Sequence, residues 1–183
     1  MSSDPAIAAS DSIGTEALFR AHAGFVASFV FRLGARGAQV DDLVQDVFLL
    51  AHGRGGYRPG AASPTTFLAR LAYEAVHGMR RRDRRFALAH TEPLAATAIG
   101  SAHESPSDAL MLQRAARDLQ TALEAIEPER RAVFILFELH GESCDAIASA
   151  FDVKVGTVYS RLHAARGEFR SCLARVARAD EER

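Results

Sequence analysis

Apolar residues recur at steps of three and four along most of the chain, whereas strand-like alternation of useful length is absent from the sequence. The first stripe, residues 18–33, predicts an amphipathic helix that stops at Gly34. A second stripe, residues 43–51, predicts a helix whose N-cap is Asp41 or Asp42. A segment rich in glycine and proline follows it and predicts a loop.

A third helix is predicted after this loop. Ser63 is a natural N-cap, and Pro64 suits the first helical position because its missing N–H has no partner there in any case. The apolar stripe continues to Met79 and runs into the basic segment RRRDRRF, residues 80–86. Residues 87–107 are small, polar and broken by proline, without clear periodicity, so they predict a flexible linker.

Helical periodicity resumes after the linker, with Ser107 or Asp108 as the predicted N-cap. Pro128 marks the start of the next predicted helix, which ends at Gly141. The pattern therefore predicts an all-α fold: two small helical domains joined by a flexible linker, with a helix-turn-helix in the C-terminal domain.

The helix-turn-helix prediction rests on the spacing in CDAIASAFDVKVGTVYSRLHAA, residues 144–165. Two steeply crossing helices need a small residue at their contact, and Ala148 provides it. The turn needs a residue that tolerates positive φ, a role for which Asp152 is better suited than most residues. Val158 fits the buried branched position of the second helix. The rest of this small core is predicted to be Ile147, Phe151, Val155 and Leu162.

The polar face of the second helix is rich in hydrogen-bond donors, and Glu168 is its single carboxylate. Such a face suits the major groove of DNA, although helix pairs also pack in this way without binding anything. Arg161 is nearer the helix start, so it is the candidate for base-edge contact. Arg166 is the candidate for a phosphate or for a salt bridge within the domain. The predicted DNA-binding residues of this helix are Lys154, Thr157, Ser160, Arg161, His163 and Arg166.

The net charge of −1 alone would argue against nucleic acid, but the charge is unevenly distributed. Arginines outnumber carboxylates in residues 1–90, carboxylates dominate residues 91–127, and the remainder is balanced. Local basic patches govern binding more than the total charge does. The cysteines, Cys144 and Cys172, lack metal-ligand spacing and favour free thiols in a reducing cytoplasm.

Two motifs resemble those of bacterial RNA polymerase sigma factors. DDLVQDVFLLAH, residues 41–52, is similar to an acidic segment of sigma region two, and GTVYSRLHAAR, residues 156–166, is similar to the end of region four. Their order across a linker resembles the extracytoplasmic-function (ECF) group of the sigma-70 family. The resemblance implies region two in residues 14–86, a linker in 87–107 and region four in 108–176.

This resemblance implies a protein that binds core RNA polymerase and directs it to promoter DNA, with an anti-sigma factor as a further partner. Region two would read the minus-ten element and region four the minus-thirty-five element. The implied polymerase-binding residues are Asp42, Gln45, Asp46 and Phe48. Without the family, they would be interpreted as a solvated helix with Phe48 in the core. A cytoplasmic location without membrane insertion is expected.

The resemblance also places promoter contacts in region two. The basic segment would follow promoter phosphates, although a solvated basic tail is the ordinary alternative. The loop around Tyr57 and Arg58 lies where the family captures an unstacked base, and both side chains offer stacking planes. An ordinary surface loop remains the alternative there. The arginines of the basic segment that would contact DNA are Arg80, Arg81, Arg82, Arg84 and Arg85.

Several positions depart from the family pattern. Phe67 stands where tryptophan is usual, and Glu74 stands where the family carries asparagine. A carboxylate beside single-stranded DNA is repulsive, so Glu74 is expected to weaken base recognition. Tyr159 and Ala164 replace basic residues of the recognition helix and remove two phosphate contacts.

Three other classes of function compete with this interpretation. An ordinary helix-turn-helix regulator would explain the second half of the chain but neither DDLVQDVF nor the basic segment. A third alternative is an anti-activator or scaffold that has a sigma-like shape but no promoter function, and it is compatible with Glu74, Tyr159 and Ala164. An enzyme is not expected, because no nucleophile–base set, phosphate loop or metal cluster stands out in the sequence. We accordingly expect no cofactor and no metal.

Overall fold

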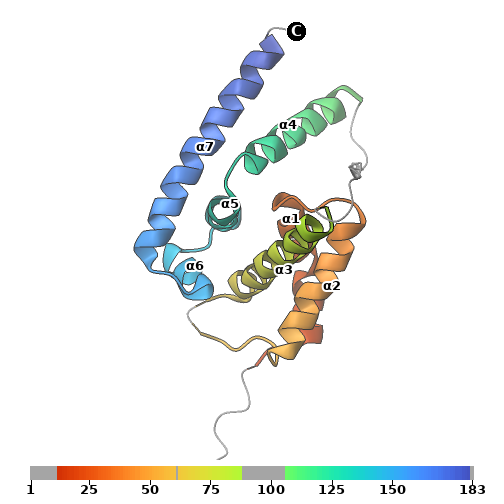
Figure 1. Ribbon diagram of the computed structural model, residues 1–183, viewed down its shortest axis with the longest axis vertical. Helices are drawn as coiled ribbons and strands as arrows, with labels where there is room; N and C mark the ends of the chain where they lie inside the picture. The colour runs from red at the N-terminus through yellow and green to blue at the C-terminus, as the bar shows by residue number, and fades with distance from the viewer. Residues whose placement is uncertain (1–11, 61, 88–105, 182–183) are drawn as a thin grey trace, which may run out of the picture.

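The computed structural model describes residues 12–60, 62–87 and 106–181, and every named element in these ranges is a helix, as predicted (Figure 1). The N-terminal bundle consists of α1 (Thr15–Arg32), α2 (Ala38–Gly53) and α3 (Pro64–Ala87). The C-terminal bundle consists of α4 (Pro106–Glu124), α5 (Pro128–Phe134), the π-helical turn η1 (Ile135–Leu139), α6 (Cys144–Phe151) and α7 (Val155–Glu181). Most of the predicted linker, residues 87–107, lies outside the described residues.

The N-terminal bundle is held together by the apolar stripes predicted from the sequence. Leu18 and Phe29 of α1, Leu43 and Val47 of α2 and Leu71 of α3 are at most 2% exposed. Burying side chains of this size contributes about 1.5–3 kcal/mol each relative to leaving them in water. The hydrophobic effect, rather than any single polar contact, therefore sets the relative positions of these three helices.

A short backbone pairing ties the start of the chain to the loop before α3. Ile13 and Tyr57 form an isolated antiparallel bridge, with N–H···O=C distances of 2.8 and 3.0 Å. Gly56 makes this approach possible, since a Cβ there would lie 2.5 Å from the carbonyl oxygen of Ile13. The φ angle of Gly56, +83°, also favours glycine.

The helix ends match the sequence predictions in part. Ser63 caps α3 by accepting a hydrogen bond from the Thr66 N–H at 3.1 Å, which confirms the predicted start. Helix α1 ends just before Gly34, also as predicted. The predicted cap of α2 at Asp41 or Asp42 was wrong, because α2 begins at Ala38 with Gly37 as its N-cap.

The C-terminal bundle begins earlier than predicted and contains one irregular turn. Helix α4 starts at Pro106, so neither Ser107 nor Asp108 is its N-cap. The helix predicted up to Gly141 is α-helical only to Phe134 and continues as η1. Cys144 and Cys172 are free and buried, in agreement with the prediction of free thiols.

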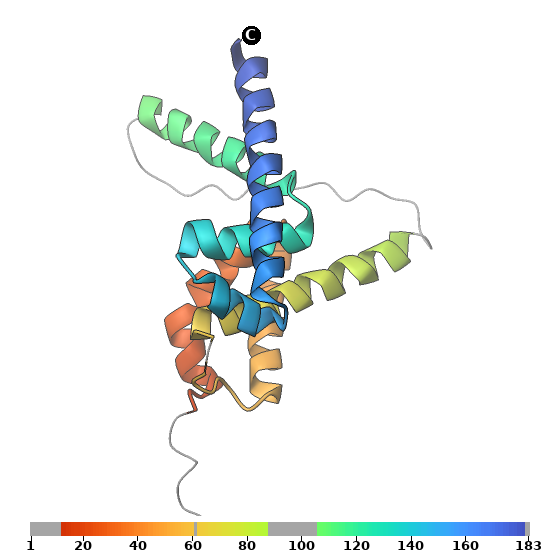
Figure 2. The same cartoon turned by 90° about the vertical axis from the view of Figure 1, so that its left-hand side faces the viewer.

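The two bundles pack against each other and share one hydrophobic core. Helix α6 lies against α3, and the guanidinium of Arg131 on α5 reaches the C-terminal end of α1. Helix α7 runs from this junction to the far end of the molecule, where the C-terminus lies (Figures 1 and 2). None of the helices among the described residues is long and apolar enough to cross a membrane.

Candidate nucleic-acid and protein interfaces

Helices α6 and α7 form the predicted helix-turn-helix. Ser143 caps α6 by accepting from the Ala146 N–H at 3.1 Å. Asp152 ends the helix in the left-handed region, with φ 51° and ψ 50°, as its position in the turn predicted. Ala148 and Val158 are both buried where the two helices meet. The sequence pattern thus identified the turn and both contact residues correctly.

The outward face of α7 carries donors and is largely open to solvent. Ser160 donates from its hydroxyl to the Thr157 carbonyl at 2.9 Å, so that hydroxyl is engaged locally. Val155 was predicted to belong to the small core, but this was wrong: its side chain is 36% exposed at the first position of α7. The exposed members of the donor face are Lys154, just before α7, and Ser160, His163 and Arg166 of α7.

Both arginines of this face are engaged in ion pairs within the C-terminal bundle. Arg161 pairs with Glu129 of α5, and its side chain is only 23% exposed. Arg166 donates from Nε to Glu138 of η1 at 2.7 Å and lies over the ring of Phe137 at 5.5 Å. Each guanidinium is therefore oriented by a carboxylate of its own bundle.

The basic segment at the end of α3 divides into one half-buried arginine and four exposed ones. Arg80 donates to the Leu33 carbonyl at the end of α1, and its burial lowers the pKa of the guanidinium. Arg82 lies 3.8 Å from Asp46 of α2. Figure 2 shows this end of α3 projecting away from the C-terminal bundle. The exposed arginines are Arg81, Arg82, Arg84 and Arg85.

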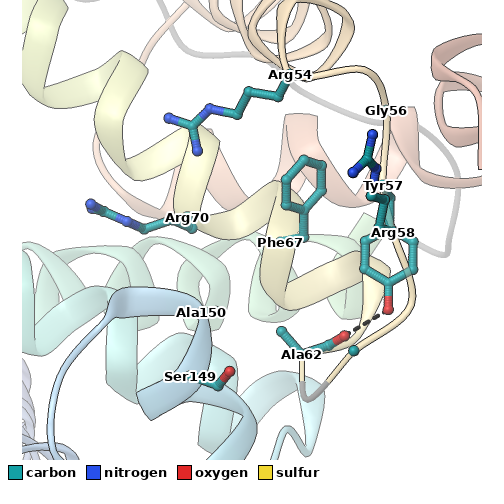
Figure 3. Close-up of a pocket in the computed structure, with 10 residues that line it drawn as sticks. Arg54, Gly56, Tyr57, Arg58, Ala62, Phe67, Arg70, Ser149 and Ala150 are labelled. Atoms are coloured by element: carbon teal, nitrogen blue, oxygen red, sulfur yellow. Dashed lines mark hydrogen bonds between the residues drawn. The ribbon is translucent and has the colours of Figure 1, made fainter. Parts of the chain in front are cut away.

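The loop after α2 forms one wall of a cleft, which we call the arginine-aromatic cleft. Its volume is about 480 Å³, and its residues from the N-terminal bundle include Arg54, Tyr57, Arg58, Phe67 and Arg70. Figure 3 shows Arg54 and Arg70 on one side of Phe67, with Tyr57 and Arg58 on the other. Ser149 and Ala150 of α6 line the cleft from the C-terminal bundle.

Tyr57 and Arg58 differ in how accessible they are within this cleft. Tyr57 is 7% exposed, donates from its hydroxyl to the Ala62 carbonyl at 2.6 Å and packs against Phe67 at 5.7 Å between centroids. Its ring is therefore part of the core, whereas Arg58 is exposed. Of the two stacking groups predicted from the sequence, only Arg58 presents its side chain to solvent.

Glu74 is flanked by two arginines that the sequence analysis did not single out. Its carboxylate lies 2.8 Å from the Arg54 guanidinium and 3.1 Å from that of Arg70. These cations offset the negative charge that was expected to repel single-stranded DNA. The pair of Arg70 and Glu74 could have been predicted from their i, i+4 spacing on one helix. The contact between Arg54 and Glu74 could not, because it depends on the conformation of the loop after α2.

The acidic helix α2 presents a mixed polar and apolar surface. Asp42 and Gln45 are exposed and Asp46 is half-buried, but Phe48 is only 6% exposed and contacts Phe19 edge-on at 5.0 Å. A groove of about 350 Å³, which we call the α1–α2 groove, lies beside them. It is lined by Thr15, Phe19, Gln45, Phe48, Leu49 and His52.

The exposed apolar residues of this groove escaped the sequence analysis. Leu49 is 67% exposed and Phe19 is 48% exposed. Large apolar side chains left open beside carboxylates are typical of protein-binding surfaces. The sequence does contain an indication of this surface. Leu49 and Leu50 lie at the edge of the apolar stripe of α2, outside the positions that face the core.

Comparison with known families gives two matches in the order of the two bundles. Residues 18–86 match the family described as "Sigma-70 region 2", and residues 116–168 match the family described as "Sigma-70, region 4". The first match covers α1–α3 and the second covers the helix-turn-helix. Both matches fall on the segments whose motifs suggested these families.

Two curated relatives and one solved structure are similar over most of the chain. "ECF RNA polymerase sigma factor SigE" of Mycolicibacterium smegmatis is 30% identical over 159 residues, covering 86% of this chain and 61% of SigE. "RNA polymerase sigma factor CarQ" of Myxococcus xanthus is 29% identical over 162 residues, covering 88% of this chain and 90% of CarQ. The fold matches sigma factor RpoE, crystallised with anti-sigma factor NepR from Bartonella quintana, with a TM-score of 0.68 and 20% identity, over 85% of this chain and 94% of RpoE.

Proposed function

The chain belongs to the sigma-70 family, in its ECF group, and on this basis we propose that it binds core RNA polymerase and directs it to promoters. The observation that carries the proposal is the presence of region 2 and region 4, in that order, on one chain with an intact helix-turn-helix. A sigma factor acts by binding and positioning rather than by catalysis, so the protein is not an enzyme. Its site of action is the cytoplasm, where core polymerase works.

Core polymerase binds the surface formed by α2 and the α1–α2 groove in this proposal. Asp42, Gln45 and Asp46 supply polar contacts, and the open side chain of Leu49 supplies apolar area. Phe48 forms the floor of the groove, since its ring is buried and packs edge-on against Phe19. This combination of an apolar centre and a polar rim fits a specific protein interface.

Region 2 contacts the minus-ten element through the basic end of α3 and the arginine-aromatic cleft. Arg81, Arg82, Arg84 and Arg85 are exposed and reach phosphates, whereas Arg80 is engaged with the α1 carbonyl. In the cleft, Arg58 offers a planar cation on which an unstacked base can lie. The charge of Glu74 is balanced by its two arginines, so it does not prevent the approach of a strand.

Region 4 reads the minus-thirty-five element with the outward face of α7. Lys154, Thr157, Ser160 and His163 lie on the part of the helix that enters a major groove. Arg161 and Arg166 join them by exchanging Glu129 and Glu138 for base edges or phosphates. Each exchange costs little, because partly exposed ion pairs contribute about 0.2–1 kcal/mol.

An anti-sigma factor is proposed as the partner that controls this activity. The support is the fold match to RpoE, which was crystallised with the anti-sigma factor NepR. Coexpression with a candidate anti-sigma factor, followed by co-purification, tests this part of the proposal separately. Separation of the two proteins during purification argues against that pair.

Reconstituted transcription tests the proposed function directly. Purified core polymerase and this protein are combined on a template carrying the region upstream of its own operon. We expect run-off transcripts with one start site when both proteins are present, and none when either is omitted. Absence of transcripts, together with tight binding of the free protein to duplex DNA as a dimer, favours the ordinary helix-turn-helix regulator instead.

A further inference from the structure

The first turns of α7 carry exposed apolar side chains among the hydrogen-bond donors. Tyr159 is 58% exposed, and Val155, one turn before it, is 36% exposed. Residues four positions apart on a helix are neighbours on its surface, so the two side chains lie side by side. We call Val155 and Tyr159 the apolar strip of α7. Figure 1 shows this end of α7 at the outer edge of the molecule, beside α6.

The side chain of Tyr159 is not held by polar or aromatic contacts within the protein. Among the residues that the structure describes, it makes no hydrogen bond, ion pair or ring contact. An aromatic ring contributes a large apolar area when a partner covers it. On the second helix of a helix-turn-helix, the partner that covers the outward face is the major groove of DNA. The ring of Tyr159 is therefore available for a contact with a base.

The surroundings of Tyr159 leave room for a groove to approach its ring. At 100° per residue, Gly156 and His163 lie within about 60° of Tyr159 around the helix axis, and both are exposed. A Cβ at Gly156 would meet nothing within 4 Å, so packing inside the protein does not require glycine there. Because Gly156 has no side chain, the ring of Tyr159 is open on that flank. The buried residues Val158 and Leu162 lie on the other flank.

The polar neighbours of the apolar strip do not compete for the same contact. The Ser160 hydroxyl donates to the Thr157 carbonyl at 2.9 Å, so it is engaged within the helix. Arg161 lies about 160° around the helix from Tyr159 and pairs with Glu129. A contact made by Tyr159 is therefore independent of the guanidinium of Arg161.

Thymine is the base that an apolar strip fits best. In the major groove it presents a 5-methyl group beside O4, whereas guanine and adenine present N7 and cytosine presents an amino group. Apolar and aromatic side chains contact this methyl group, and arginine or lysine at the same place would favour guanine or a phosphate. The position of Tyr159 is basic in the family pattern, so this chain has a different contact there.

We propose that Tyr159, flanked by Val155, selects a thymine in the minus-thirty-five element by packing against its 5-methyl group. This inference rests on the proposed function of α7. It makes Tyr159 a specificity-determining residue that requires an A·T pair at one position of the element. Covering one methyl group with apolar surface corresponds to about a fourfold change in affinity.

Selection of upstream elements by the holoenzyme is the first test. Core polymerase with the full-length protein binds a library of the promoter upstream of its own operon, in which the minus-thirty-five element is randomised. We expect the unmodified protein to enrich thymine at one position and Tyr159→Ser to lose that preference alone. Tyr159→Phe retains the ring and should retain the preference. Leu139→Ser alters another exposed apolar side chain of the C-terminal bundle, 40% exposed, and is the matched control.

Replacement of the enriched thymine by deoxyuridine isolates the methyl group. Deoxyuridine pairs as thymidine does and keeps O4, but it lacks the 5-methyl group. We expect this replacement to weaken holoenzyme binding about fourfold with the unmodified protein and with Tyr159→Phe, and to leave the affinity of Tyr159→Ser unchanged. The four combinations of protein and DNA form a double-mutant cycle. Tyr159→Arg should also lose the dependence on the methyl group, and the salt dependence of its binding should become steeper by about one ion.

The remaining outcomes overturn the proposal. If the holoenzyme enriches no thymine, or if deoxyuridine weakens Tyr159→Ser as much as the unmodified protein, Tyr159 does not contact a methyl group. A preference that survives Tyr159→Ser but is lost in Val155→Ser assigns the contact to Val155 and overturns the role of Tyr159. Failure of the proposed function is recognised separately, since a protein that is not a sigma factor forms no complex with core polymerase and enriches no sequence with any variant.

Discussion

The guanidinium of Arg161 pairs with the carboxylate of Glu129, so the arginine that we propose as the base reader of α7 is held against α5. In the proposed complex, contact of Arg161 with a base of the minus-thirty-five element competes with this pair. Glu129→Gln removes the competing charge and should tighten binding of the element by about 0.2–1 kcal/mol. Arg161→Ala should weaken binding by about 1–3 kcal/mol and reduce discrimination among element variants. Transcription from a panel of upstream-element variants measures both effects, and an equal loss on every variant contradicts base reading by Arg161.

Arg166 is expected to act differently, because its side chain lies along Phe137 and pairs with Glu138. Arg166→Ala should weaken all upstream-element sequences alike. If Arg166 meets a phosphate, the salt dependence of binding should become shallower by about one ion. The measurement is affinity at several salt concentrations for holoenzyme formed with each variant. A loss confined to one sequence variant argues that Arg166 contacts a base.

The α1–α2 groove allows polymerase binding to be separated from folding. Leu49→Ser alters a side chain that is 67% exposed, so its stability should change by no more than about 0.5 kcal/mol. Phe48→Ala removes a buried ring and should cost about 3–5 kcal/mol of stability. We expect Leu49→Ser to lower affinity for core polymerase at an unchanged melting temperature. Gln45→Ala should add to the loss, and unaltered affinity in the folded double variant counts against this surface.

Two adjacent glycines in the loop after α2 provide a matched test of the bridge to Ile13. Gly55 and Gly56 both have positive φ, +78° and +83°. A Cβ at Gly55 meets nothing within 4 Å, whereas one at Gly56 lies 2.5 Å from a backbone oxygen. Gly55→Ala should therefore cost about 1–2 kcal/mol from backbone strain alone. Gly56→Ala should cost more, and urea denaturation that ranks the two in the reverse order contradicts the close approach.

Two histidines make stability sensitive to mild acid. His140, packed on Phe25, and His77, packed on Tyr73, each have a buried Nε2 without a hydrogen-bond partner. Burial is the main cause that lowers the pKa of both imidazoles. Arg32 lowers the pKa of His140 further and Glu142 opposes it; Arg80 and Arg81 lower that of His77, opposed by Glu127 and Glu129.

Because the folded protein holds these groups neutral, the unfolded chain binds more protons below the ordinary value of 6.5. Stability should be at its full value above that pH. It should decrease as the pH falls through 6.5 towards the lowered pKa values. Thermal melts between pH 8 and pH 5.5 measure this slope, and His140→Phe should flatten it. An identical slope in that variant excludes His140 as a contributor.

The sequence predicted those features that depend on neighbouring residues. Asp152 takes the left-handed conformation expected of the turn, and Ser63 caps α3, because both outcomes follow from local backbone chemistry. The start of α2 was misplaced, since Gly37 rather than an aspartate precedes the first turn and the Gln39 side chain accepts from the Arg36 N–H at 3.2 Å. Either kind of cap is locally acceptable, and the extra turn contains Val40, which is 8% exposed and therefore packed in the core.

Features that depend on contacts between distant parts of the chain could not be predicted from local sequence patterns. Arg80 sits in a run of arginines that all look alike in sequence, but only the fold brings it to the end of α1. Val155 has an apolar side chain at helical spacing, yet it lies on the open side of α7. The pairing of Arg161 with Glu129 joins residues 32 positions apart, which no local pattern of charges indicates.

The Leu33 carbonyl accepts from both Arg80 of region 2 and Arg131 of region 4, which makes this contact between the regions reversible. When region 4 departs, Arg80 remains on that oxygen, so region 2 keeps its acceptor satisfied. Arg131 likewise retains the carbonyls of Glu124 and Ile126 within region 4. Leaving a buried polar group without a partner costs about 1–3 kcal/mol, and at this point separation leaves none. The Leu33 carbonyl has a second donor within region 2, and Arg131 has further acceptors within region 4. The contact between the regions can therefore break and reform without leaving an unpaired polar group in either region.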